Sequence, residues 1–277
     1  MRDLPLGAVI AFDFESWNIR DEIALLGRAG IRRVQIYRNY IQGITAAHVR
    51  ETLDAAGLVV DSLHGYFSLD KIPGPPCDLS SPDPAARAAA LEIMRGEADF
   101  ARALGCRDIV IHPVCGGNTE ADPGRRTALE ESTRALAALA GERQVRFLIE
   151  NMPPPMFGRD AKMLRQIVDE FGGPHVGLNY DAGHAYLAGD AVGTVLEMGP
   201  RLWGIHMHDT RGKEDDHILP GMGVIPFDDV ARAVSATGFD GTFIVEVYRP
   251  TEEVQRDLTD ERLAHIHRLR RMASGRA

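Results

Sequence analysis

Histidine and carboxylate side chains stand at the ends of six consecutive apolar segments of the sequence. Phe147, Leu148 and Ile149 run directly into Glu150, and a similar apolar run precedes Glu246. A buried carboxylate costs several kcal/mol unless it has a partner, and a cation is the simplest partner. The terminal residues are His64, His112, Glu150, Asp181, His206 and Glu246. Mixed imidazole and carboxylate ligands suit Mn²⁺, Zn²⁺, Co²⁺ or Mg²⁺, so this pattern predicts a divalent metal site.

Each of these residues also has an ordinary structural explanation. A single histidine at a strand end is more often a hydrogen-bonded core residue than a ligand. Glu150 and Glu246 could pair with rim arginines such as Arg159 or Arg249, and Asp181 could cap a helix that begins in the segment DAGH. His208 stands two residues after His206, on the same side of a strand, where it would bind substrate or support a ligand. Only the joint pattern favours a metal over these explanations.

The elements that must position these residues alternate along the chain. Short β-branched or apolar runs are followed by longer amphipathic stretches, which is the pattern of parallel strands joined by helices. Strands are expected at 8–14, 33–37, 58–67, 108–114, 146–152, 175–181, 202–209 and 242–248. We therefore predict an α/β fold, a single (β/α)8 TIM barrel that occupies residues 1–277 as one domain.

The connections between these strands support the same prediction. Helices are expected over residues 19–30, 82–105 and 123–142, where apolar residues recur every three or four positions and glycine stands at or near the end. Tandem prolines in PGPPC (73–77) and MPPPMFG (152–158) predict loops at the rim. The carboxyl ends of all barrel strands face one opening, so ligands from separate strands converge there.

Composition narrows the class of partner. The formal charge of −9 over 277 residues repels phosphate polymers, so a small molecule is expected rather than a nucleic acid. No stretch approaches the roughly 18 apolar residues of a membrane span, and we expect a cytoplasmic protein without membrane contact, alone or as a homo-oligomer. Cys77, Cys106 and Cys115 fit neither a zinc knuckle nor a disulfide framework and are expected to carry no chemistry.

At these residues the sequence resembles the xylose isomerase-like barrel superfamily, which includes ketose 3-epimerases, hydroxypyruvate isomerase and inosose dehydratases. The resemblance runs over nearly the whole chain and is most specific in FLIENMP, LNYDAGHAYLAGD, GIHMHDTRGKEDDHILPGMGVI and FIVEVY. It implies that one metal ion is held by Glu150, Asp181, His206 and Glu246. Around it, we expect the substrate to be bound by His64, His112, His184, His208 and Arg211. Arg211 stands one position short of the arginine that ketose epimerases carry.

The same segments are similar to endonuclease IV, whose cluster of three zinc ions uses nine ligands. That similarity implies that the four ligands above are joined by His64, His112, His184, Asp215 and His217. Against a nuclease, the chain is acidic and shows no basic loops after the early strands that would grip DNA. A pattern of the form DxHxxPGxG, present at 215–223, is shared by many sugar-isomerising barrels.

The leading functional hypothesis is isomerisation or epimerisation of a small sugar, sugar phosphate or hydroxy-ketone. Glu150 and Glu246 would remove and return a proton on opposite faces of a planar enediolate. Metal ligation would keep both carboxylates ionised. The alternatives are an endonuclease IV-like multi-zinc phosphoesterase, a metal-dependent polyol-ketone dehydratase and a non-catalytic sugar-binding barrel.

Overall fold

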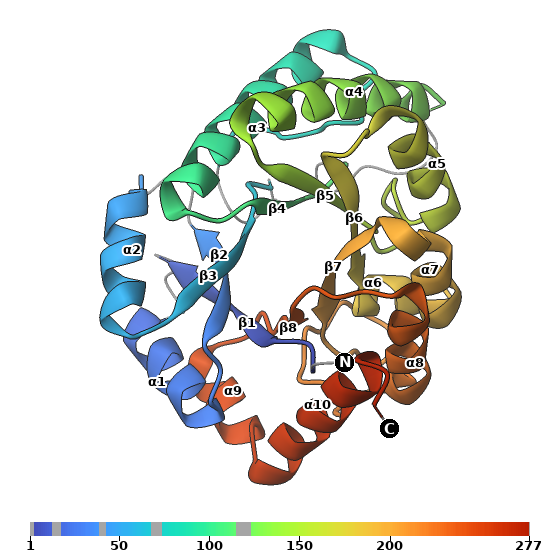
Figure 1. Ribbon diagram of the computed structural model, residues 1–277. Coiled ribbons are helices and arrows are strands. Elements are labelled where there is room, and N and C mark those ends of the chain that lie inside the picture. Colours follow the sequence, from blue (N-terminus) through green and yellow to red (C-terminus); the bar gives the residue numbers. More distant parts are fainter. Residues whose placement is uncertain (1–2, 13–17, 39–42, 68–73, 115–122, 277) are drawn as a thin grey trace.

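Eight parallel strands close into a barrel that is surrounded by helices (Figure 1). The computed structural model describes residues 3–12, 18–38, 43–67, 74–114 and 123–276. Each strand pairs with the next one along the chain, and β8 pairs back onto β1 through Leu6 and Phe243. The strands are β1 (Leu6–Phe12), β2 (Arg33–Arg38), β3 (Val59–His64), β4 (Asp108–Ile111), β5 (Arg146–Glu150), β6 (Val176–Asp181), β7 (Leu202–Met207) and β8 (Phe243–Val245).

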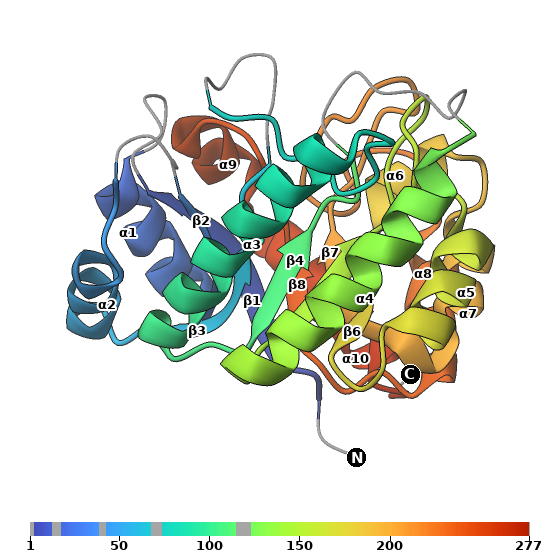
Figure 2. The ribbon, with the colours of Figure 1, turned by 90° about the horizontal axis from the view of Figure 1, so that it is seen from above.

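The helices lie outside the strands, and Figure 2 shows α3 and α4 side by side along one flank of the barrel. The helices are α1 (Ile19–Ala29), α2 (Ala46–Ala55), α3 (Pro84–Leu104), α4 (Arg125–Arg143), α5 (Ala161–Phe171), α6 (Ala182–Leu187), α7 (Ala191–Met198), α8 (Phe227–Thr237), α9 (Thr251–Asp257) and α10 (Asp260–Ala273), with a short 3₁₀ turn at Gly199–Arg201. Within the described residues, none of the helices has the length and apolar character needed to cross a bilayer.

The predicted (β/α)8 barrel is therefore confirmed, with shifts at several boundaries. The first strand begins two residues before the expected 8–14, and residues 13 and 14 lie outside the described part of the chain. The third and eighth strands end earlier than expected, at His64 and Val245. The long helix expected at 82–105 begins at Pro84 because Asp83 caps it, and it ends before Gly105, which has a φ of 80°. That residues 1–277 form one domain stays a prediction.

The two-residue period of the strands decides which side chains reach the barrel mouth. Leu148 and Asn179 line a cavity inside the barrel, toward the amino ends of the strands. Glu150 and Asp181 stand two positions further along, so they share the inward face and lie at the carboxyl end. The residues between them, such as Ile149 and Tyr180, are buried on the helix side. The polar residues that follow the apolar runs therefore lie together at the carboxyl end of the barrel.

Candidate metal centre

Four predicted ligands from four neighbouring strands meet at the carboxyl end of the barrel. Glu150, Asp181 and His206 belong to β5, β6 and β7, and Glu246 directly follows β8. One ligand atom from each lies within 4.8 Å of those of the others. All four side chains are buried. Because a site for a single small cation requires donors at such mutual distances, these residues fit a metal ion.

The imidazole of His206 lies among the three carboxylates. Its Nδ1 atom is 3.1 Å from Glu246 Oε1, 3.4 Å from Glu150 Oε2 and 3.9 Å from Asp181 Oδ2. None of these contacts has hydrogen-bond geometry, and Glu246 Oε2 is likewise buried without a hydrogen-bond partner. Buried polar atoms are normally satisfied, so these atoms are where a cation would be expected.

The charges of this cluster also favour a cation at its centre. Burial alone would raise the pKa of Glu150 and of Glu246, but the surrounding histidines, chiefly His206, together outweigh burial and hold both pKa values well below the ordinary range. Burial would lower the pKa of His206, and the two glutamates instead raise it well above its usual value. The carboxylates therefore stay ionised beside a cation, which is a proton on the imidazole or a metal ion that replaces it.

A second group of possible ligands adjoins the first through Glu150. Nε2 of His64 is 3.7 Å from Glu150 Oε2, and Nε2 of His112 is 3.9 Å from the same oxygen. His64 Nδ1 lies 3.0 Å from the carbonyl of Gly65, to which it donates when Nε2 is left unprotonated. Burial lowers the pKa of His112 to about 3, so its ring is neutral near pH 7. Both rings can thus present a lone pair toward Glu150.

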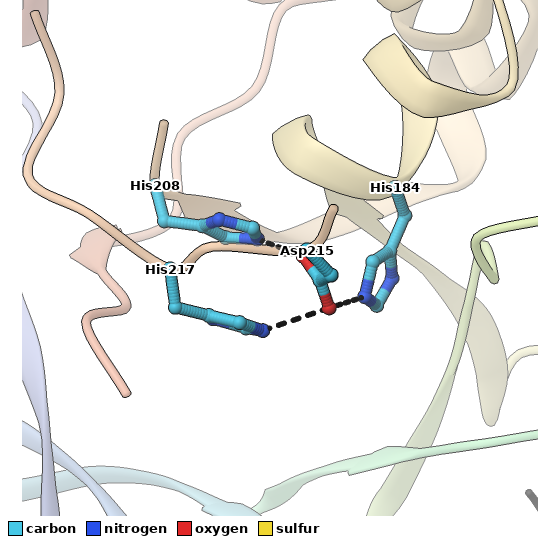
Figure 3. Close-up of side chains that lie close together, drawn as sticks. All are labelled: His184, His208, Asp215 and His217. Carbon is cyan, nitrogen blue, oxygen red and sulfur yellow. Dashed lines mark hydrogen bonds and ion pairs between the residues drawn. The ribbon is translucent and has the colours of Figure 1, made fainter. Parts of the chain in front are cut away.

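The third group consists of His184, His208, Asp215 and His217, which point toward one another in Figure 3. His184 Nε2 and His217 Nε2 each lie 3.0 Å from Asp215 Oδ2. The rings of His208 and His217 are stacked, with centroids 3.9 Å apart. Burial opposes a charge on His217, but Asp215 outweighs it and raises the pKa of His217 to about 9. In this group one carboxylate and three imidazoles hold protons where they could hold a metal cation.

Asp181 combines the role of helix cap with its place in the cluster. It is the N-cap of α6, and its Oδ1 accepts a hydrogen bond of 2.7 Å from the backbone N–H of His184. His208 Nε2 lies 3.0 and 2.9 Å from the two oxygens of Asp181. A Cβ on Gly183 would come within 2.1 Å of the His208 ring, so glycine is required there. The expectation that Asp181 caps a helix is correct, and this role does not prevent its carboxylate from binding a metal ion.

The sequence analysis missed Asp209, which organises the loop that carries Asp215 and His217. Asp209 is fully buried, and its carboxylate accepts four backbone hydrogen bonds across the loop. The donors are the N–H groups of Thr210, Gly221, Gly223 and Ile225. The signal in the sequence was the pair of glycines in PGMG, because closely spaced backbone donors need a buried acceptor.

We expect Asp209→Ala to lower the free energy of unfolding by at least about 2 kcal/mol, since it leaves several buried N–H groups without an acceptor. Denaturant unfolding monitored by circular dichroism measures this loss. Asp229→Ala is the matched control, because Asp229 is exposed and its side chain pairs with Arg232 at the surface. Equal stability of the two variants would contradict the assigned role.

Two of the four candidate ligands, Glu150 and Glu246, line a pocket of about 250 Å³. Glu150, Glu246, His112, His184, Asp215 and His217 form its polar part. The rest of its lining is aromatic or apolar and consists of Tyr37, Phe67, Val114, Met152, Pro153, Met156 and Tyr248. A cavity of this kind, mostly apolar with a few convergent polar groups, is typical of a small-molecule site.

Comparison with known proteins assigns the family. The family described as "Xylose isomerase-like TIM barrel" matches residues 23–269, which is most of the barrel. The chain belongs to this family. The resemblance inferred from the strand-end residues is thereby confirmed.

Among curated proteins, this xylose isomerase-like barrel is similar to L-ribulose-5-phosphate 3-epimerase UlaE of Salmonella paratyphi A, with 24% identity over 251 residues, 90% of this chain and 82% of that protein. UlaE of Escherichia coli O1:K1 is 27% identical over 176 residues, 63% of this chain and 62% of that one. An uncharacterized protein of Sinorhizobium fredii is 29% identical over 158 residues. This chain spans only 51% of the length of that last relative.

Solved structures share the fold of this family member at low sequence identity. A xylose isomerase domain protein from Planctomyces limnophilus superposes with a TM-score of 0.78 at 19% identity, covering 99% of this chain and 100% of that one. A D-allulose 3-epimerase from Methylomonas sp. gives a TM-score of 0.77 at 20% identity, with 97% and 99% covered. These likenesses establish the barrel architecture.

Several residues that the sequence analysis named lie away from this centre or outside the described part of the chain. The Arg211 side chain is 58% exposed and pairs with Asp216, so the structure does not bring it to the pocket. Arg249 pairs with Glu253, whereas Glu150 and Glu246 form ion pairs with His206. Cys115 lies outside the described residues. Cys77 and Cys106 are free and buried, and burial raises the pKa of Cys106 to about 12.

Proposed function

We propose that this chain is a divalent-metal-dependent isomerase or epimerase that acts on a small sugar, sugar phosphate or hydroxy-ketone. The observation that carries the proposal is the buried group of Glu150, Asp181, His206 and Glu246 at the floor of a pocket of about 250 Å³. The names of the UlaE relatives and of the D-allulose 3-epimerase support the same class of reaction. We propose a cytoplasmic location and leave both a monomer and a homo-oligomer open.

These four residues would hold Mn²⁺ or Zn²⁺, and their donor set also suits Co²⁺ or Mg²⁺. When bound there, the metal would polarise the carbonyl and hydroxyl oxygens of the substrate and make the neighbouring C–H more acidic. The residues fit because each offers an anionic oxygen or an imidazole nitrogen, and some of these atoms have no hydrogen-bond partner.

Glu150 and Glu246 would move the proton. They come from β5 and β8, which are separated by β6 and β7, so they approach the pocket from different sides. Glu246 Oε1 accepts a hydrogen bond from the Tyr37 hydroxyl, while Oε2 has no hydrogen-bond partner and could take a proton from carbon. Glu150 Oε2 accepts a hydrogen bond of 3.3 Å from Asn179, which orients it. One carboxylate removes the proton and the other returns it on the opposite face.

The remaining histidines would position the substrate and these carboxylates. His112 and His184 line the pocket, where both rings would contact the substrate. The ring nitrogens of His184 face the Asn151 carbonyl and Asp215, which hold its orientation. His64 and His208 are buried against Glu150 and Asp181, respectively, and would bind substrate only by way of those carboxylates. Asn151 was also missed by the sequence analysis; it bonds both backbone groups of Asp181 and holds β6 in place.

The proposal is tested by turnover in heavy water. If Glu150 and Glu246 exchange a carbon-bound proton, a ketose incubated with the metal-loaded enzyme should gain deuterium at the carbon next to the carbonyl. Nuclear magnetic resonance or mass spectrometry measures the label. Loss of water from the product would instead indicate a polyol-ketone dehydratase, which begins with the same proton removal. Isomerisation without any label would favour a hydride shift over proton exchange by the two carboxylates.

A specific observation favours a second candidate, a multi-zinc phosphoesterase. All nine residues of the endonuclease IV pattern lie in the three adjoining groups, and Glu150 belongs to two of them. Clustered cations could activate water and neutralise a leaving oxygen. Metal analysis of the purified chain separates the candidates, because the isomerase needs one tightly bound ion and the phosphoesterase needs three. Three zinc ions with cleavage of abasic DNA would replace the isomerase as the conclusion.

A further inference from the structure

We infer that the substrate of this site is an uncharged ketose or hydroxy-ketone rather than a phosphate ester. The inference rests on the proposed function and names the chemical class within it. Its basis is the lining of the pocket above the metal ligands. Among the described residues that line the pocket there is neither an arginine nor a lysine. Phosphate groups are usually held by arginine, lysine or the N-terminal N–H groups of a helix.

Helix N-termini can bind phosphate in place of an arginine or lysine, but the ones near this pocket are unsuited to it. Many barrels bind phosphate in the loops after strands seven and eight and at a nearby helix N-terminus. Here α8, which follows β7, carries Asp228 and Asp229 in its first turn. α9, which follows β8, carries Glu252 and Glu253 in the same place. These carboxylates occupy the position that would attract an anion, and they would repel a phosphate.

Arginines around the barrel mouth face acidic side chains. Arg211 pairs with Asp216 and Arg249 pairs with Glu253. Arg38, at the end of β2, forms a buried ion pair with Glu97. A phosphate that recruited one of these guanidinium groups would leave a carboxylate without its partner, which for Glu97 means a buried one. These three guanidinium groups are therefore already neutralised.

The floor of the pocket is itself acidic. Glu150, Glu246 and Asp215 line it, and Asp181 lies buried beside them. The positive charges on His184 and His217 already face Asp215, with each Nε2 atom 3.0 Å from its Oδ2. A dianionic phosphate held in the pocket would lie close to these carboxylates in a poorly screened environment. A neutral polyol would not be repelled by them.

The walls suit the carbon-bound hydrogens of a sugar. Tyr37 lies between Phe67 and Tyr248, with ring centroids 5.9 Å from each. Met152 and Met156 contribute thioether side chains to the same lining. Aromatic and thioether surfaces pack against the apolar parts of a neutral ligand, while the polar floor engages its oxygens. The end of the substrate that does not react would therefore lie against an uncharged wall.

A matched pair of probes tests the inference, L-ribulose and L-ribulose 5-phosphate, because the UlaE relatives are named for the phosphate ester. With the metal-loaded enzyme, solvent deuterium exchange gives kcat/KM for each compound, and calorimetry gives its affinity. We expect the free ketose to be favoured at least about 10-fold in both measurements. Favoured binding and exchange of the ester would overturn the inference while leaving the proposed function intact. Absence of exchange with both compounds would overturn the function, and the inference with it.

Two variants of Met156 sharpen the test. Met156→Arg places a cation in the wall, and Met156→Gln has similar size without charge. We expect the ratio of kcat/KM for the ester to that for the free ketose to rise at least about 10-fold in the arginine variant and to change little in the glutamine variant. An unchanged ratio in both variants would mean that charge in this wall does not set specificity, which also overturns the inference.

Discussion

Glu246→Gln should lower turnover by at least about 10²-fold, the usual effect of losing a general base. Glutamine keeps the size of the side chain and one oxygen that can bind a metal or accept from Tyr37. It cannot accept a proton from carbon near neutral pH. Deuterium exchange into the ketose measures the loss directly, and metal analysis of the same preparation shows whether the ion is retained. We expect occupancy to fall much less than rate.

Glu253→Gln is the matched control for this experiment. Glu253 also follows β8 in the chain, but it pairs with Arg249 and does not line the pocket. Its replacement should leave exchange within about two-fold of the native rate, since surface substitutions rarely matter. Native turnover in Glu246→Gln would show that Glu246 is not a base. Glu150→Gln requires the same comparison, because the two carboxylates are proposed to share the proton transfer.

Asp181→Ala should remove the tightly bound metal while the barrel remains folded. It deletes one of four ligands, and even outer partners of a metal site are worth roughly 10–100-fold in affinity, so the loss for a direct ligand should exceed 100-fold. Metal analysis after gel filtration measures occupancy, and circular dichroism reports the fold. Asp181→Asn separates the two roles of this residue, because asparagine still caps α6 but lacks the anionic charge. It should lose metal and keep the helix.

Asp160→Ala is the control for the capping role alone. Asp160 caps α5 through a hydrogen bond of 3.1 Å to the N–H of Met163 and lies away from the ligands. Its loss should cost about 1 kcal/mol of stability and no metal. Full occupancy in Asp181→Ala, with the native fold, would remove Asp181 from the ligand set. Full occupancy in Glu246→Ala as well would end the assignment of the whole centre.

The sequence by itself determined the barrel and the six strand-end positions. Apolar runs such as the one before Glu150 are buried on both faces only in a sheet covered by helices, and the two-residue period then sends the last residue inward. For this reason the sequence alone predicts that His64, Glu150 and His206 lie at the same end of the barrel. The same reasoning did not predict the last residue of each strand: β8 ends at Val245, earlier than the apolar run suggested.

Only the tertiary structure decided which of these polar groups face one another and which do not. Arg211 follows β7 as the family pattern suggests, yet the Asp216 carboxylate holds both its backbone N–H and its guanidinium at the surface. Asp209 was expected only as the last residue of the strand at 202–209, and it anchors the loop that brings His217 against His208. Side-chain direction in loops depends on hydrogen bonds between residues distant in sequence. A sequence pattern indicates the periodicity and burial of residues, but it does not indicate which of them form hydrogen bonds with one another.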